Sequence, residues 1–176
     1  MYNFKKMFVM LFLGFGSGLP YILLISTSTA WLRDVNIDLS YIGFFTWITF
    51  SYTFKFIWAP IVDRFPVPFL AKYGHRKSWI ALMQILIFGS LLLISNINPV
   101  ENFILFCVVG VTIALAGSIQ DIAIDAFRIE YAHISDQGNL AASYQLGYRL
   151  AIIAATSLAL IFADINGWSM TFKLMA

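Results

Sequence analysis

Five long apolar stretches dominate the sequence and restrict the solvent in which the chain can fold. They run over residues 7–32, 41–62, 78–95, 102–126 and 140–163. An α-helix needs about 20 mostly apolar residues to cross a hydrocarbon core about 30 Å thick, so each stretch is predicted to be a membrane-spanning helix. A sixth helix is expected to start at residue 170. Its roughly two turns before Ala176 are too few to span.

The composition agrees with a lipid environment. Hydrophobic residues make up 60% of the 176 residues and charged residues 11%, whereas soluble domains are about half apolar and about a quarter charged. The connections between the stretches are short, so no extramembrane domain is expected. The net charge is only +2 and the basic residues form no stripe. The lipid bilayer is therefore the expected partner, and nucleic acid is not.

Lysine and arginine are distributed unequally between the two ends of the predicted helices. Seven fall on one side if the helices alternate in direction: Lys5, Lys6, Arg64, Lys72, Arg76, Lys77 and Arg128. By the positive-inside rule, the N-terminus and the loop 63–77 are expected to face the cytoplasm. The apolar stretch after Lys6 resembles a signal peptide but is longer than its usual core, so residues 7–32 are predicted to remain as the first span.

The first stretch contains the segment LGFGSGLP, residues 13–20. Gly14 and Gly18 form a G-x-x-x-G pattern, and small residues at this spacing allow two helices to approach closely. Pro20 removes one backbone hydrogen bond and is expected to bend the helix. The pattern favours close helix packing, with a role in gating as the alternative.

Four ionisable residues lie within the apolar stretches, where each is costly unless it is paired or hydrated. A spacing of four places Asp121 and Asp125 on one helical face. Arg128 follows Asp125 by three residues and is expected to pair with it. Asp121 lies deeper and needs a partner on another helix. Lys55 and Arg149 are at a matching depth and are the two candidates.

Three roles remain open for the two acids: a structural ion pair, a site of proton or substrate coupling, and a metal site. Hard cations such as Mg²⁺ require several oxygen ligands. Membrane enzymes that bind Mg²⁺ and a diphosphate use two acidic motifs on separate helices, and only one acidic pair is present in the predicted helices. We therefore expect no bound metal, no cofactor and no enzymatic activity. An intramembrane Mg²⁺-dependent prenyl-type transferase is the least favoured function.

The segment APIVDRF…GHRKSW, within residues 59–79, resembles the signature between helices two and three of major facilitator transporters, G-x-x-x-D-R-x-G-R-K. Ala59 stands at the position of the first glycine, and the loop is longer than in the signature. The resemblance implies a cytoplasmic gate formed by the matching residues. These are Asp63, Arg64, Gly74, Arg76 and Lys77.

Other segments resemble AmpG-type muropeptide permeases, a branch of the same superfamily. In chain order they are GFGSGLPYIL, NIDLSYIGFF, YTFKFIWAPIVDRF, SIQDIAIDAFRIEY and LGYRLAI. The Q-D-x-x-x-D segment is also similar to acetyl-CoA transporters. The resemblance implies an all-α membrane fold of two six-helix halves, and proton-coupled import of anhydromuropeptides through the bacterial inner membrane for cell-wall recycling. The expected pathway residues are Lys55, Gln120, Asp121, Asp125 and Arg149.

On this resemblance, residues 1–176 are the N-terminal half-domain of such a transporter. Transporters of this kind bind their substrate between two halves, so one half lacks a wall of the cavity. The sequence leaves two alternatives to an active transporter: a half-transporter that needs a separate C-terminal chain, and a truncated remnant that does not transport. Lys55 and Arg149 are compatible with an anionic small-molecule solute.

Overall fold

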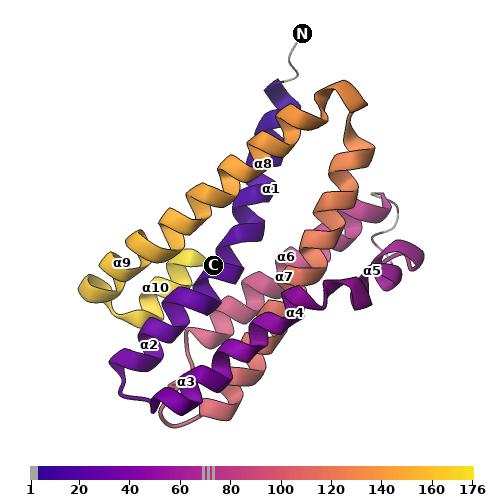
Figure 1. Cartoon of the computed structure of the whole chain (residues 1–176). Helices are drawn as coiled ribbons and strands as arrows, with labels where there is room; N and C mark the ends of the chain where they lie inside the picture. The colour runs from indigo at the N-terminus through magenta and orange to yellow at the C-terminus, as the bar shows by residue number, and fades with distance from the viewer. Residues whose placement is uncertain (1–3, 69, 71, 73) are drawn as a thin grey trace.

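The computed structural model describes residues 4–68, 70, 72 and 74–176, which fold into a bundle of helices (Figure 1). Three residues of the loop 63–77, at positions 69, 71 and 73, lie outside the described residues. Four helical stretches are long and apolar enough to cross a membrane: Phe4–Asp34, His75–Ile94, Phe103–Tyr131 and Ile134–Asn166. The all-α membrane fold is supported, whereas the expected five spans and the start of a sixth are not confirmed.

The first stretch is one continuous helical segment with an irregular turn. It consists of α1 (Phe4–Ile22), the π-helical turn η1 (Leu23–Thr27) and α2 (Ser28–Asp34). Pro20 lies inside α1 and has no N–H to donate to the carbonyl of Gly16. The wider turn begins three residues after this missing bond, and π-turns are often found at functional positions.

The second stretch, expected as one helix over residues 41–62, is a series of short helices. These are α3 (Leu39–Thr46), the 3₁₀ turn η2 (Trp47–Thr49), α4 (Phe50–Thr53) and α5 (Lys55–Arg64). Phe54 separates α4 from α5 with φ −90° and ψ 17°. Aromatic and β-branched side chains lose rotamer freedom in a helix, and this part of the chain is rich in both. The apolar length was therefore recognised, but the interruption was not.

The other helices lie close to their expected positions. They are α6 (His75–Ile94), α7 (Phe103–Tyr131), the 3₁₀ turn η4 (Ile134–Asp136), α8 (Gln137–Ile153), the π-turn η5 (Ala154–Leu158), α9 (Ala159–Asn166) and α10 (Trp168–Met175). The main difference is α7, which continues beyond the expected end at residue 126. Gly167 has φ 79° and turns the chain, so that α10 folds back beside α9 (Figure 1).

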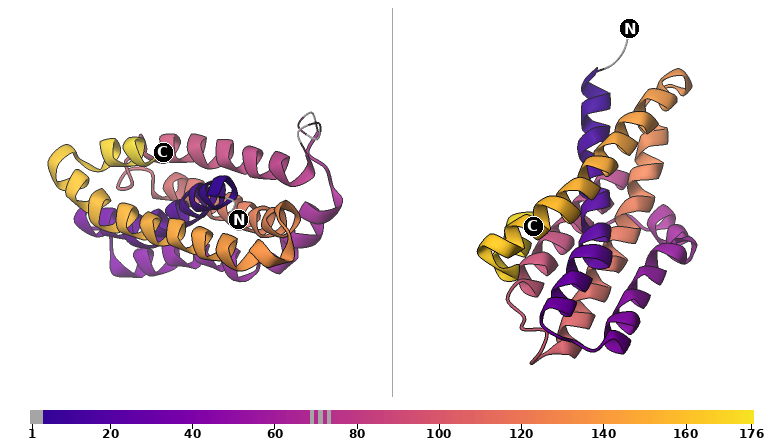
Figure 2. Two further views of the ribbon diagram at one scale, coloured as in Figure 1. Left: turned by 90° about the horizontal axis from the view of Figure 1, so that it is seen from above. Right: turned by 60° about the vertical axis from the view of Figure 1, so that its left-hand side comes forward.

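Helices α1 and α8 lie side by side, as the different views show (Figures 1 and 2). A Cβ atom on Gly14 of α1 would lie 2.0 Å from the carbonyl oxygen of Tyr144. A Cβ atom on Gly147 of α8 would lie 1.9 Å from the carbonyl oxygen of Leu11, and Gly18 also faces α8. The G-x-x-x-G pattern therefore forms the close helix contact that the sequence predicts.

Helix α7 is the centre of the bundle and contacts α1, α4, α5, α6 and α8. At the end near α10, the buried ring of Trp31 has its centroid 5.4 Å from that of Phe106 on α7 and 5.3 Å from that of Phe172 on α10. This apolar cluster fixes α2 and α10 against α7. The polar residues of α7 lie toward its other end, where α1, α5 and α8 meet it.

Candidate functional site

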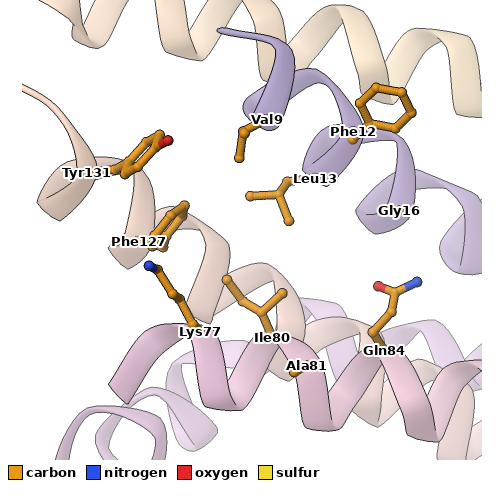
Figure 3. Close-up of a pocket in the computed structure, with 10 residues that line it drawn as sticks. All are labelled: Val9, Phe12, Leu13, Gly16, Lys77, Ile80, Ala81, Gln84, Phe127 and Tyr131. Atoms are coloured by element: carbon orange, nitrogen blue, oxygen red, sulfur yellow. The ribbon is translucent and has the colours of Figure 1, made fainter. Parts of the chain in front are cut away.

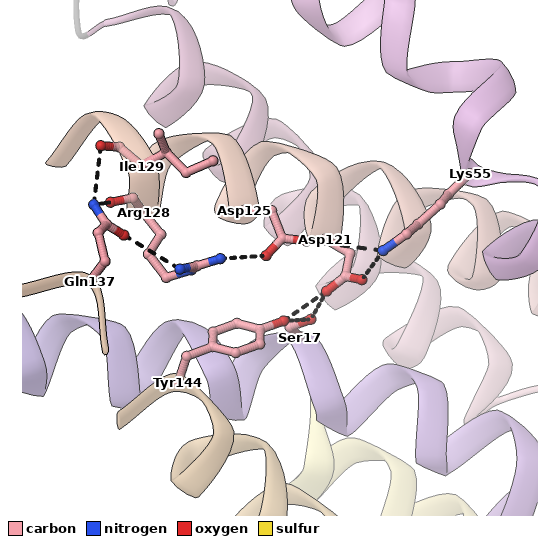
Figure 4. A network of polar contacts seen from close by, with 8 residues as sticks. All are labelled: Ser17, Lys55, Asp121, Asp125, Arg128, Ile129, Gln137 and Tyr144. Carbon is pink, nitrogen blue, oxygen red and sulfur yellow. Dashed lines mark hydrogen bonds and ion pairs between the residues drawn. The ribbon is translucent and has the colours of Figure 1, made fainter. Parts of the chain in front are cut away.

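Asp121 lies on α7 where three other helices reach it (Figure 4). Its Oδ1 atom accepts hydrogen bonds from Ser17 Oγ of α1 and from the Tyr144 hydroxyl of α8, both at 2.7 Å. Its Oδ2 atom lies 3.3 Å from Nζ of Lys55, the first residue of α5. The Asp121 side chain is only 20% exposed. The carboxylate is thus held by two hydroxyl groups and one ammonium group from three different helices.

The local sequence explains how these groups meet. Lys55 follows the break at Phe54 directly, so it starts a helix of its own instead of continuing the direction of α4. The Tyr144 hydroxyl also lies 2.9 Å from Ser17 Oγ, which links α8 to α1 across the acid. Tyr52 and Tyr148 are close enough to interact with the charge of Asp121. Polar side chains therefore line the surroundings of an acid inside a membrane-spanning helix.

Asp125 is one turn further along α7 and is held less closely. Its side chain is 48% exposed, and its Oδ1 atom lies 3.8 Å from Nη2 of Arg128. Its Oδ2 atom lies 4.0 Å from Nζ of Lys55. Gln137 accepts a hydrogen bond from Arg128 at 3.4 Å (Figure 4). The expected pair with Arg128 is present, and Lys55 lies within 4.0 Å of both acids.

Gln120 is fully buried and joins α7 to α1. Its Nε2 atom donates to the carbonyl oxygen of Gly16 at 3.4 Å. This is the carbonyl that Pro20 leaves without its usual helical partner. Within the described part of the chain, the Oε1 atom of Gln120 is buried and has no hydrogen-bond partner. Its place in a substrate or proton pathway stays a prediction.

Arg149 is not brought to the acids. It is exposed on α8, and no ion pair with it is found among the residues that the structure describes. Of the two candidate partners of Asp121, the structure selects Lys55. Tyr144 and Gly147 show why: these residues face α1, and Arg149 lies at another angle around the helix axis. A role of Arg149 toward a solute stays a prediction.

A second charged cluster joins the ends of three helices. Arg76 of α6 donates from Nη1 to Oδ1 of Asp63 at 2.6 Å and from Nε to Oε1 of Glu130 at 3.1 Å. Arg76 is 16% exposed, whereas Asp63 and Glu130 are more than half exposed. Two of the predicted gate residues, Asp63 and Arg76, are therefore in contact. Glu130 was not predicted, because the helix was expected to end before it.

The other predicted gate residues have different positions. Gly74 precedes α6 with φ 107°, a conformation that favours glycine. Arg64 and Lys77 are exposed and form no ion pair within the described residues. His75 is half-buried, with Nε2 2.7 Å from the carbonyl oxygen of Val62.

Ser17 and Tyr144 were not among the residues predicted for the site. Neutral hydroxyl groups are common in membrane-spanning helices, where they often bond to their own backbone. Only the three-dimensional contact of α1, α7 and α8 shows that both face Asp121. Their closeness follows from the small residues between α1 and α8, whose G-x-x-x-G pattern was predicted to serve packing, with gating as the alternative.

A separate cleft of about 550 Å³ lies between α1, α6 and α7 (Figure 3). Its walls are mainly apolar, with Leu13, Ile80 and Phe127 among them, and Lys77 and Gln84 are its main polar residues. None of the predicted pathway residues lines this cleft. No group of three or more metal-ligating side chains is found among the described residues.

Several helices long and apolar enough to span a membrane, with a paired acid inside the bundle, are typical of multi-pass membrane transporters. The family model described as "Acetyl-coenzyme A transporter 1" matches residues 6–124, and the chain belongs to this major facilitator-type family.

Curated relatives agree with the AmpG-type resemblance. The chain is 35% identical over 173 residues to putative transporter AmpG 4 of Rickettsia conorii, covering 97% of this chain and 42% of that relative. It is 37% identical over 169 residues to the anhydromuropeptide permease of Escherichia coli K12, covering 96% of this chain and 34% of that relative. The chain thus spans about two fifths or less of the length of these relatives.

Proposed function

We propose that residues 1–176 form the N-terminal half-domain of a proton-coupled importer of anhydromuropeptides for cell-wall recycling. The transporter class rests on the family, and the name of the Escherichia coli relative supports the substrate. The distribution of lysine and arginine supports a cytoplasmic N-terminus in a bacterial inner membrane.

The observation that carries the proposal is the contact between Asp121 and Lys55 inside a helical bundle. An ionisable residue in a spanning helix is costly unless it is paired, and such residues mark proton and substrate pathways. A proton on Asp121 removes its charge and weakens the contact with Lys55. The freed ammonium group can then pair with Asp125 or with an anionic group of the solute.

The distances indicate that this exchange is inexpensive. With an effective dielectric constant of about 20, the attraction of Lys55 is about 5 kcal/mol to Asp121 at 3.3 Å and about 4 kcal/mol to Asp125 at 4.0 Å. These values are gross attractions, and the partial exposure of Lys55 reduces both. Lys55 is already within 4.0 Å of Asp125 while it is paired with Asp121, so neutral Asp121 leaves Lys55 a second carboxylate without a large movement.

Two further elements complete the proposal. Asp63, Arg76 and Glu130 act as a cytoplasmic latch, since they join the ends of α5, α6 and α7. A second helical half, in the same polypeptide or in a separate chain, supplies the other wall of the cavity. The greater length of the relatives supports this partner.

Uptake of labelled anhydromuropeptide into membrane vesicles tests the proposal, with the chain alone and with a co-expressed C-terminal half of a relative. Asp121→Asn is expected to lower uptake at least about tenfold and to abolish its pH dependence, because the neutral amide cannot exchange a proton. Asp164→Asn is the control, since Asp164 is exposed on α9. Asp121→Asn with wild-type rate and pH dependence would show that the coupling role is wrong.

The same assay separates the alternatives for the whole chain. Uptake that requires the second half would identify a half-transporter. No uptake with or without that half would contradict the proposed transport and favour a non-transporting remnant.

A further inference from the structure

One short helix connects the acid inside the bundle to the latch at its end. Helix α5 carries Lys55 at its first position and Asp63 at its ninth. Lys55 contacts Asp121, and Asp63 contacts Arg76. Near the same end, the carbonyl oxygen of Val62 is bonded to the ring of His75. A movement of α5 relative to α7 therefore changes both clusters together.

The position of α5 depends on the break at Phe54. No regular helix continues through this residue, so the direction of α5 is not set by the hydrogen bonds of α4. Something else must hold the chain in place just before the break. Tyr52, two residues earlier, is in a position to do so because α4 packs against α7.

Tyr52 is seated in a notch on α7. A Cβ atom on Gly117 would lie 2.1 Å from the Tyr52 hydroxyl oxygen and 3.1 Å from its ring carbon Cζ. The hydroxyl is buried and finds no hydrogen-bond partner among the described residues. On its other side, the ring packs edge-on against Tyr21, with centroids 4.6 Å apart. Tyr52 is thus held by shape complementarity rather than by a hydrogen bond, and this requires glycine at position 117.

We propose that Tyr52 is a positioning residue, which anchors the chain before Phe54 so that Lys55 reaches Asp121 and α5 holds Asp63 at Arg76. Gly117 and Asp121 lie four residues apart on one face of α7, so the anchor and the ion pair are neighbouring turns of the same surface. The meaning of this contact for transport rests on the proposed function. When Asp121 loses its charge, α5 turns at Phe54 while Tyr52 stays seated.

The groups that face Asp121 from the elements around it are Lys55 of α5, Ser17 of α1, Tyr52 of α4, and Tyr144 and Tyr148 of α8, with Asp125 on its own helix. Lys55 is the cation among them in direct contact with Asp121, and its position depends on the start of α5. A displacement of Tyr52 therefore affects Asp121 by moving Lys55.

The test measures the position of α5 directly. Spin labels are placed at two exposed positions, Ile61 on α5 and Ile104 on α7, in a Cys107→Ala background reconstituted into lipid vesicles. Pulsed dipolar spectroscopy then gives the distance distribution between the labels. The reference protein, which carries only the two spin labels and Cys107→Ala, is expected to give one narrow distribution. Asp121→Asn is expected to shift it, because Lys55 is released.

The decisive variants form a cycle at the notch. Gly117→Ala is expected to shift or broaden the distribution beyond the width of the reference peak, because the new Cβ expels the Tyr52 hydroxyl. Tyr52→Phe is expected to leave the distribution unchanged. Combining both is expected to restore it, since removal of the hydroxyl leaves a nearest contact of 3.1 Å, which a small shift of the ring by a few tenths of an ångström relieves. Gly89→Ala, with no atom within 4 Å of the added Cβ, is the matched control.

Tyr52→Ala provides a second test that does not depend on tolerance of a new methyl group. It removes the anchor and is expected to broaden the distribution. An unchanged distribution in Gly117→Ala or in Tyr52→Ala, or failure of Tyr52→Phe to restore Gly117→Ala, would overturn the inference. Uptake is measured in parallel and is expected to lose its pH dependence in Gly117→Ala. If no variant transports, the proposed function fails, and the distances still decide the role of Tyr52.

Discussion

Replacing Gly147 by alanine is expected to separate α1 from α8 and to loosen the Asp121 site. The added Cβ would lie 1.9 Å from the carbonyl oxygen of Leu11, whereas ordinary contacts begin at 3.4 Å. The two helices must therefore move apart by about 1.5 Å, because backbone atoms cannot rotate away like a flexible side chain. Tyr144 moves with α8. Its hydroxyl is 2.7 Å from Asp121, and the same displacement along that direction breaks the hydrogen bond.

The expected loss of stability follows from these two effects. Overpacking costs about 1–3 kcal/mol, and a lost hydrogen bond to a charged group costs about 1.5–3 kcal/mol. Alanine has a higher helix propensity than glycine, which offsets up to about 1 kcal/mol. The free energy of unfolding is therefore expected to fall by about 1.5–6 kcal/mol.

Reversible unfolding in mixed micelles, followed by circular dichroism, measures this free energy. Gly138→Ala is the matched control, since Gly138 lies on the same helix and its added Cβ has no atom within 4 Å. This control is expected to be as stable as the wild type, or more stable by up to about 1 kcal/mol. Equal free energies of unfolding for Gly147→Ala and Gly138→Ala would refute the close contact between α1 and α8.

Two further substitutions test the other contacts of α7. Arg76→Gln is expected to lower the free energy of unfolding by less than about 1 kcal/mol, because Asp63 and Glu130 are mostly exposed. Hydrogen exchange of α5 measured by mass spectrometry is nevertheless expected to accelerate, and unchanged exchange would contradict the latch. Gln120→Leu is expected to cost about 1–2 kcal/mol, because the carbonyl of Gly16 loses its donor. Unfolding in mixed micelles checks this value, and wild-type stability would exclude a significant bond.

The positions of the helices were predictable because a chain in lipid must satisfy its backbone hydrogen bonds within each segment. Apolar length therefore located each helical stretch. The same argument does not detect the break at Phe54 or the π-turns η1 and η5, which alter the backbone without changing the apolar composition. The end of α7 was also missed. The apolar run ends near residue 126 and Arg128 was placed beyond the span, but the helix itself continues to Tyr131.

The candidate site was predictable in part. Depth in the membrane identified Lys55 and Arg149 as possible partners of Asp121, but depth says nothing of the angle around a helix axis. The structure supplies that angle and selects Lys55. The hydroxyl groups of Ser17 and Tyr144 were beyond sequence reasoning, because each becomes significant only through contact with a distant helix.

The difference between the two acids decides which of them is suited to coupling. Asp121 has three donors within 3.3 Å on three helices, so a change in its charge alters contacts with α1, α5 and α8 at once. Asp125 has longer contacts of 3.8 Å and 4.0 Å and is 48% exposed, so water screens its charge. A proton on Asp125 would leave those helices in place. In the proposed exchange, Asp125 is therefore better suited to accept Lys55, and Asp121 is better suited to release it.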